Sequence, residues 1–229
     1  MNIVECKDIS KKFKDKKILD NVNISIKKNE IISLVALNGQ GKTTFFRMLT
    51  QLAKPDNGKF LYNGKDRPDE NLIFFVPEIT KGFPLLNINE TVDFFSTLEK
   101  NNVDKNALDE VLEKSSLLNE TNRTESFSKG MRQKLWLCLA AISKSKLIII
   151  DEPLGGLDIK GKQFFKYVSQ KIKENGNTLL CSSHDLETVF EISERFLFIE
   201  KKDRKMISKN KDEFHSIKEF KDFFEKVSG

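Results

Sequence analysis

A short glycine-rich segment, residues 36–44, contains the residue types needed to bind a polyphosphate. It lies between an apolar run at 31–35 and a helix-like stretch that starts near Phe45. Glycines let backbone N–H groups close around phosphate oxygens, and a helix N-terminus adds partial positive charge. Lys42 can reach the β- and γ-phosphates, and the Thr43 hydroxyl can hold Mg²⁺. The order of strand, loop and helix therefore predicts a nucleoside triphosphate site rather than an ordinary glycine-rich turn.

The loop departs from the usual pattern at its first position, where Ala36 stands in place of glycine. Alanine resists a positive φ by about 1–2 kcal/mol if the loop needs that conformation. Gly39 and Gly41 remain, so we expect a slightly reshaped loop that still binds nucleotide. The residues assigned to nucleotide contacts here are Asn38, Gly39, Gln40, Gly41, Lys42, Thr43 and Thr44.

Two carboxylates follow a second apolar run. Leu147–Ile150 is continuously apolar, which is typical of a strand covered on both faces, and Asp151 and Glu152 come directly after it. In open α/β sheets, ligands bind at the carboxyl ends of such strands. We therefore expect both carboxylates at the same edge as the phosphate loop.

Two more polar residues follow predicted buried strands. Glu78 comes after the apolar segment 71–76, and His184 comes after 177–182. A lone histidine after a strand is more often structural or exposed than functional. Taken singly, neither residue would indicate a site.

Length and composition limit the class of protein. The chain has 229 residues, a net charge of +5 and 32% charged residues, and its basic residues are dispersed and mostly lysine. Nucleic-acid binding favours clustered, arginine-rich faces, so we expect no nucleic-acid partner. The N-terminus lacks a secretory signal, and no apolar run approaches the ~20 residues of a membrane helix. Cys6, Cys138 and Cys181 lack metal-ligand spacing and predict reduced core thiols in a cytosolic protein.

The order of these features resembles the ATP-binding cassette (ABC) family over nearly the whole chain. In that family the phosphate loop and the strand before Asp151 are the Walker A and Walker B elements, and 127–131 stands where Leu-Ser-Gly-Gly-Gln is usual. The resemblance rests on six features in chain order: the phosphate loop, Glu78, Phe127–Met131, Asp151–Glu152, Gly155–Asp158 and His184.

The resemblance implies roles for the residues around the phosphates. Thr43 and Asp151 would anchor Mg²⁺ between the β and γ oxygens, beside Lys42. Glu152 would be the general base for the attacking water, a role worth about 10²–10⁴ in rate. His184 would contact the γ-phosphate and hold the water and Glu152 in register. The implied cofactors are ATP and Mg²⁺.

Two further residues gain candidate roles from the resemblance. The family usually has glutamine at the position of Glu78, where the side chain senses Mg²⁺ and water. Glutamate can still contact metal or water, but its negative charge would change metal affinity and coupling; we include it as a catalytic and metal-binding candidate. Phe13 resembles the aromatic residue that stacks on adenine, although from the residues alone it could equally fold onto the sheet.

The segment 127–131, called the signature segment here, implies a second ATPase subunit as partner. Ser128 and the backbone N–H groups around Gly130, at a helix N-terminus, can grip a γ-phosphate. In the family that phosphate belongs to ATP on the opposite subunit, so two copies, identical or different, enclose two nucleotides. Asp158 resembles the loop aspartate that crosses the dimer interface and joins the nucleotide-binding set. The segment departs from the usual signature at Phe127, Lys129 and Met131.

The predicted fold class is α/β. The resemblance implies a P-loop NTPase core with a mixed or parallel sheet at 1–78 and 146–229, and alternating apolar residues at 2–6 and 22–26 predict an N-terminal β part, antiparallel in the family. Helical spacing of apolar residues predicts a helical subdomain within 79–145, which carries the signature segment.

Three local predictions complete the fold. The helix after the phosphate loop should run to about Leu52, and Asn63-Gly64 should join two short strands as a hairpin. Phenylalanines at helical spacing within 214–227 predict a C-terminal amphipathic helix that caps the domain, although a lysine-rich helix of this kind could instead lie on a membrane.

The predicted function is that of an ATPase subunit. It would act on separate membrane permease subunits at the cytoplasmic face of the cell membrane, with export favoured over import. Their helices should dock near 79–95, where the apolar loop 82–86 could alternatively serve internal packing. Alternatives are a soluble ABC-type ATPase of translation or chromosome maintenance and a non-hydrolysing ATP-gated module. The chain shows neither two cassettes nor a heptad run, and Glu152 argues against the module.

Overall fold

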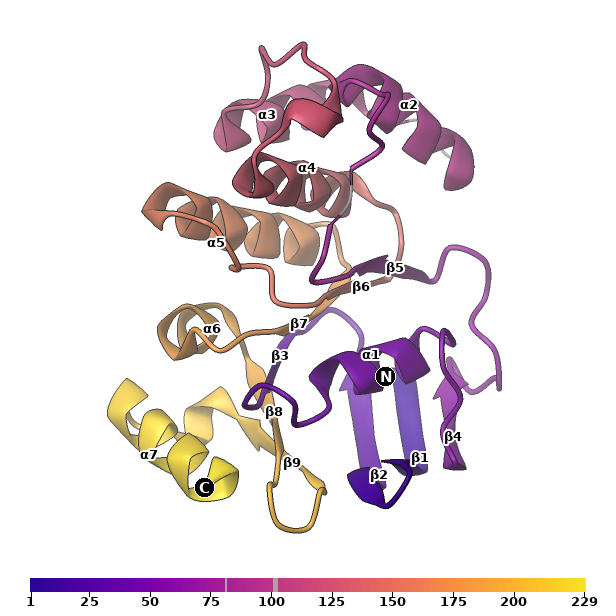
Figure 1. The fold of residues 1–229 in the computed structure, drawn as a ribbon, viewed down its shortest axis with the longest axis vertical. Helices are drawn as coiled ribbons and strands as arrows, with labels where there is room; N and C mark the ends of the chain where they lie inside the picture. The colour runs from indigo at the N-terminus through magenta and orange to yellow at the C-terminus, as the bar shows by residue number, and fades with distance from the viewer. Residues whose placement is uncertain (81, 101–102) are drawn as a thin grey trace.

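Two sheets and the helices around them make up the fold. A computed structural model describes residues 1–80, 82–100 and 103–229. Within these ranges the larger sheet has six strands and the smaller has three. Figure 1 shows the small sheet beside α1 (Lys42–Leu49) in the lower part of the molecule, with the larger sheet running through the middle and a stack of helices at the top.

The larger sheet is mostly parallel because crossover helices connect its strands. In β6 (Leu147–Ile150) alternate side chains point to opposite faces. Ile148 and Ile150 pack against the helices α4 (Lys129–Ile142) and α5 (Ile159–Glu174), whereas Leu147 and Ile149 pack toward α1 and the small sheet. Burial on both faces explains the continuous apolar run. The strand order is β5 (Ile73–Val76), β6 (Leu147–Ile150), β7 (Thr178–Ser182), β3 (Ile31–Val35), β8 (Arg195–Ile199) and β9 (Met206–Asn210), with only β9 antiparallel to its neighbour.

The small sheet is antiparallel, with β1 (Asn2–Phe13) between β2 (Lys16–Lys27) and β4 (Asn57–Tyr62). Its apolar face and α1 share one core; Phe45 and Phe46 of α1 are fully buried there. The predicted α/β class, with its N-terminal antiparallel part, is confirmed.

The helical subdomain packs on the face of the larger sheet that is opposite α1 and the small sheet (Figure 1). Local caps begin its helices: Asn87 and Glu90 form a reciprocal capping box, and the Ser128 hydroxyl accepts from the Met131 N–H. The subdomain boundaries remain a prediction. The helices of this face are α2 (Ile88–Leu98), α3 (Lys105–Ser115), the short turn Thr124–Ser126, α4 (Lys129–Ile142) and α5 (Ile159–Glu174).

A phenylalanine cluster holds the C-terminal helices onto the sheet. Phe196 and Phe198 of β8 contact Phe220 of α7 (Ile217–Ser228), with ring centroids 4.5 and 5.7 Å apart. The apolar face of α7 is therefore covered by the domain itself, which confirms the capping helix and not the membrane-surface alternative. Two shorter elements complete this part, α6 (Leu186–Ile192) and the turn Lys211–Glu213.

Three sequence predictions need correction. α1 ends at Leu49 rather than near Leu52, because Gln51 adopts a positive φ of 60°. Beyond Asn63-Gly64 there is only an isolated Tyr62–Lys65 bridge and no second strand, so the hairpin was wrong. The segment at 71–76 forms the edge strand β5, in which only Val76 is fully buried, because no strand covers its outer side.

All three cysteines are buried, as predicted. Burial raises the pKa of the Cys138 and Cys181 thiols to about 12 and raises that of Cys6 further. A thiol with so high a pKa is not a nucleophile near neutral pH. These residues serve as small core side chains.

Candidate functional site

Glycine at two positions allows a tight loop before α1. Gly39 has φ 76° and Gly41 φ 113°, values that L side chains rarely adopt. A Cβ on Gly41 would also lie 2.6 Å from Ile18 Cγ2, so the loop packs closely on β2. Ala36 is not among the positive-φ residues of the described chain. The strain considered for alanine at this position therefore does not arise.

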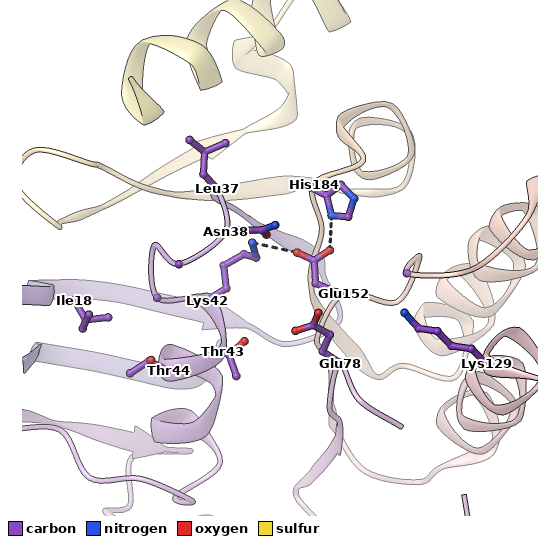
Figure 2. Close-up of a pocket in the computed structure, with 13 residues that line it drawn as sticks. Ile18, Leu37, Asn38, Lys42, Thr43, Thr44, Glu78, Lys129, Glu152 and His184 are labelled. Carbon is purple, nitrogen blue, oxygen red and sulfur yellow. Dashed lines mark hydrogen bonds and ion pairs between the residues drawn. The ribbon is translucent and has the colours of Figure 1, made fainter. Parts of the chain in front are cut away.

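Lys42 lies in the first turn of α1 and is buried under the loop. Its ammonium donates to the Ala36 carbonyl at 2.8 Å and lies 3.1 Å from Glu152 Oε1. Figure 2 shows the Lys42 side chain directed across the cavity toward Glu152. Without nucleotide, the lysine is thus paired with a carboxylate at the end of β6.

The two predicted magnesium anchors touch each other. Thr43 Oγ1 donates to Asp151 Oδ2 at 2.7 Å, and Ser182 Oγ donates to Asp151 Oδ1 at 2.5 Å. Hydroxyl and carboxylate oxygens are ligands that Mg²⁺ prefers. In residues 1–80, 82–100 and 103–229, no group of three or more His, Cys, Asp or Glu could hold a metal. The donor set fits an ion whose coordination is completed by phosphate oxygens and water.

Glu152 is held between two neighbours. It has a left-handed backbone, φ 51°, which is costly for a non-glycine residue, and its N–H donates to Ser182 Oγ at 2.9 Å. Glu152 Oε2 lies 2.9 Å from His184 Nδ1, and the imidazole is largely exposed. The result is a carboxylate with one oxygen beside a lysine and the other beside a histidine.

These groups border one cavity of about 430 Å³, within the usual range for small ligands. Figure 2 shows the loop side chains on one side and Glu78, Glu152 and Lys129 on the other. Two lysines, two carboxylates and an open glycine loop together suit an anionic ligand that carries a metal. The lining residues are Ile18, Leu37, Asn38, Gly39, Gly41, Lys42, Thr43, Thr44, Glu78, Lys129, Glu152, Gly155 and His184.

Comparison with known proteins decides the family. A family model described as "ABC transporter" matches residues 19–155. The chain is 30% identical over 200 residues to the lantibiotic transport ATP-binding protein SrtF of Streptococcus pyogenes, with 86% of each chain covered. The chain belongs to the ABC transporter family. The predicted resemblance is confirmed, and the chain is an ATP-binding subunit of this family.

Other relatives of this ABC cassette differ in length. It is 33% identical over 210 residues to the spermidine/putrescine import ATP-binding protein PotA of Clostridioides difficile strain 630. The matched region covers 87% of this chain but only 60% of that relative. The chain thus spans about three fifths of that relative's length. The fold matches the dimeric structure of MJ0796, a bacterial ABC transporter cassette, with a TM-score of 0.77 at 23% identity, covering 90% and 98% of the two chains.

Several predicted residues of the cassette lie outside the cavity lining. Phe13, at the end of β1, is 54% exposed, and the Lys11 ammonium lies 5.6 Å from its ring centroid. Ser128 caps α4, and Asp158 caps α5 by accepting from the Gly161 N–H at 2.7 Å. The predicted residues that do not line the cavity are Phe13, Gln40, Ser128, Gly130, Asp151 and Asp158.

Five contributors to the site were not among the predicted site residues: Ser182, Ile18, Leu37, Lys129 and Gly155. Ser182 bonds both to Asp151 and to the backbone of Glu152; its position at the end of a predicted buried strand was the available signal. Ile18 and Leu37 supply apolar walls that no motif marks. In the described part of the chain, no helix is long and apolar enough to cross a membrane.

Proposed function

We propose that this chain binds MgATP and hydrolyses it as the ATPase subunit of a transporter with separate membrane subunits. The observation that carries the proposal is Glu152, whose carboxylate meets Lys42 on one side and His184 on the other at the edge of a loop-walled cavity. An oriented base next to a phosphate-binding loop is what ATP hydrolysis requires.

Thr43 and Asp151 would hold Mg²⁺, which, when bound, neutralises charge between phosphate oxygens. Phosphate oxygens would draw the Lys42 ammonium away from Glu152 Oε1. That oxygen could then accept a proton from the attacking water, while His184 keeps Oε2 in place. Lys42 therefore changes partner, and the change makes the base available only when nucleotide is present.

The proposed active form is a dimer. Ser128 and Gly130 stand at the N-terminus of α4 but do not line the cavity of their own chain, which supports action on nucleotide held by a second copy. The second copy can be identical or a related cassette. Phe13 would stack on the base and Asp158 would cross between subunits, as the family resemblance implies.

We place the contact with membrane subunits near 79–95. Ile79, Leu85 and Phe94 are exposed there. Phe83 instead packs edge-on against Phe94 at 5.1 Å and lies 6.0 Å from Trp136, so internal packing accounts for part of this apolar segment. The docked complex would lie at the cytoplasmic face of the membrane. Export remains our predicted direction.

Phosphate release by wild type and Glu152→Gln tests the enzyme. We expect MgATP turnover in the wild type and a fall of about 10²–10⁴ in the variant, with nucleotide binding retained. Glu152→Gln, which would hold MgATP without hydrolysing it, should also elute as a dimer on gel filtration with MgATP. Equal rates would remove Glu152 as the base, and a strictly monomeric variant would remove the dimer.

A second measurement tests the transporter role. Crosslinking in native membranes should capture a multi-span permease through residues near Leu85. Transport in inside-out vesicles then gives direction. Capture of ribosomal or chromosomal proteins alone would favour the soluble alternative, and ATP binding without turnover, even with the permease present, would favour the gated module.

A further inference from the structure

Two oppositely charged side chains face the cavity from its helical-subdomain side. Glu78 follows β5, and Lys129 is the first residue of α4. Both line the cavity, yet among the described residues neither forms an ion pair. Lys42 and Glu152, by contrast, already pair with each other at 3.1 Å. Lys129 is therefore the lining cation that has no carboxylate partner in this state of the described chain.

Lys129 reaches the cavity beside two glycines, and the absence of a Cβ on Gly156 leaves room for its stem. A Cβ on Gly156 would lie 3.1 Å from Lys129 Cδ and 3.4 Å from Cε, and a Cβ on Gly155 would lie 3.9 Å from Nζ. The aliphatic stem therefore packs over the bare backbone at 155–156. Figure 2 shows the ammonium end directed inward, on the side opposite the phosphate loop.

The cavity wall opposite the phosphate loop carries carboxylate charge that a cation there can offset. Glu78 and Glu152 both line it, and Asp151 lies behind Thr43. A nucleoside triphosphate adds several negative charges, which repel carboxylates strongly where water is partly excluded. From the loop side they are opposed by Lys42 and by the Mg²⁺ that Thr43 and Asp151 would hold. A second ammonium on the facing wall would offset Glu78 and attract the polyphosphate.

We propose that Lys129 is a nucleotide-binding residue of its own chain, which contacts the terminal phosphate and offsets Glu78. It would act on the ligand in the same subunit, whereas its neighbours Ser128 and Gly130 are assigned to the second copy. The inference rests on the proposed function, because it requires that the cavity bind ATP. It makes Lys129 a determinant of ATP over ADP.

The test measures binding to the monomer. Affinities for a non-hydrolysable ATP analogue and for ADP, each with Mg²⁺, are measured by fluorescent-nucleotide displacement at concentrations shown by ultracentrifugation to keep the chain monomeric. For Lys129→Met we expect the analogue Kd to rise about three- to tenfold, and the ADP Kd to change less than about twofold. Lys134→Met removes the same charge from the same helix, outside the cavity lining, and should leave both unchanged.

Glu78→Gln supplies the complementary arm. Because Glu78 is also a metal-binding candidate, this arm is measured without Mg²⁺. Glu78→Gln should then tighten analogue binding, and Glu78→Gln combined with Lys129→Met should return the Kd to within about twofold of wild type, because the two charges act in opposite directions. Thermal unfolding of each variant shows whether the fold is intact; if Lys129→Met unfolds, Lys129→Gln takes its place.

Three results would overturn the inference. The first is unchanged analogue affinity of Lys129→Met as a monomer with weakened dimerisation, since Lys129 would then serve the second copy. The second is an equal loss for the analogue and ADP. The third is an equal loss in Lys134→Met. Absence of nucleotide binding in the wild type would overturn the proposed function as well, so the two failures are distinguishable.

Discussion

Two ion pairs of similar burial lie at opposite ends of the central sheet and differ in how completely they are bonded. Lys42 and Glu152 have side chains 7% and 9% exposed, and Arg195 and Glu30 have side chains 8% and 10% exposed. A buried charge is costly unless it is paired and hydrogen-bonded. Because the two pairs are similarly buried, the charges of each need comparable bonding to offset their loss of hydration.

The Arg195–Glu30 pair is saturated. Arg195 donates to both carboxylate oxygens of Glu30, at 2.5 and 3.1 Å, to the Ser25 carbonyl at 2.7 Å and to Ser208 Oγ at 3.0 Å. Glu30 also accepts from the Lys27 N–H at 2.6 Å. The pair joins β2 and its following turn to β8 and β9, and its role is structural.

The Lys42–Glu152 pair is incomplete. Glu152 Oε1 lies 3.1 Å from the ammonium but is not in hydrogen-bond geometry with any described group. Its other oxygen faces an exposed imidazole. Because the pair borders an open cavity, water and phosphate can replace the missing bonds. The difference teaches that equal burial does not imply equal bonding, and the under-bonded pair is the one for which we propose a change of partner.

Replacing the two glutamates gives the sharpest contrast. Glu30→Gln leaves the Arg195 guanidinium buried without a carboxylate and should lower the free energy of unfolding by about 3–5 kcal/mol. Glu152→Gln should lower it by less than about 1 kcal/mol, because water in the cavity can solvate Lys42. Urea unfolding measures both. Equal losses of unfolding free energy in the two variants would show that water in the cavity does not solvate the Lys42 ammonium once its carboxylate partner is gone.

Removing the cation at the cavity should cost binding instead of stability. Lys42→Met deletes the charged donor for phosphate oxygens and should weaken ATP affinity by about 10- to 100-fold, as expected for hydrogen bonds to charged groups. Calorimetric titration with MgATP measures the loss. A stability loss as large as that of Glu30→Gln, with binding preserved, would assign Lys42 a structural role.

Ser182 tests whether the two carboxylates are held as a unit. Ser182→Ala removes one bond to Asp151 and one to the Glu152 backbone, and should lower the free energy of unfolding by about 1–2 kcal/mol. Val168→Ala, in the same core but away from the cavity, separates a general packing loss from a site effect. Only Ser182→Ala should also reduce phosphate release.

The partly exposed ion pair between Lys162 and Asp185 should give the smallest change in stability. Burial raises the pKa of Asp185, but hydrogen bonds from Lys162 and the Thr188 N–H outweigh it, so the pKa lies below its usual 3.8. The stabilisation is present above the unfolded-state pKa and is lost as pH falls through the lower folded value. Asp185→Asn should therefore lower the free energy of unfolding slightly near pH 7 and flatten the stability profile below about pH 4, so that variant and wild type converge in acid. A variant profile that parallels the wild type in acid would contradict this assignment.

Strong local signals made much of the fold predictable. The apolar runs at 147–150 and 177–182 gave strand bounds within a residue, because burial on both faces requires uninterrupted apolar side chains. α6 and β9 were not predicted. α6 has seven residues, too few to show a helical period, and β9 is a half-exposed edge strand with a polar sequence.

The candidate site was predictable in its chemistry and less so in its contacts. The loop, Asp151–Glu152 and His184 could be named because motif order identifies the ends of particular strands. Ile18 and Ser182 could not, since neither residue type is distinctive. The position of Lys129 in the cavity wall depends on Gly156, in a different loop, which leaves space for its stem.

The amino-acid sequence alone determined the family and the α/β class, because six motifs follow one another in the family's order, and it named the residues predicted for phosphate, metal and proton chemistry. Only the tertiary structure decided which of these groups touch. Thr43 and Asp151 are 108 residues apart in the chain and 2.7 Å apart in space, and no local pattern encodes that distance. The sheet sets it, by ending β3 and β6 at one edge, where Lys42 also lies 3.1 Å from Glu152.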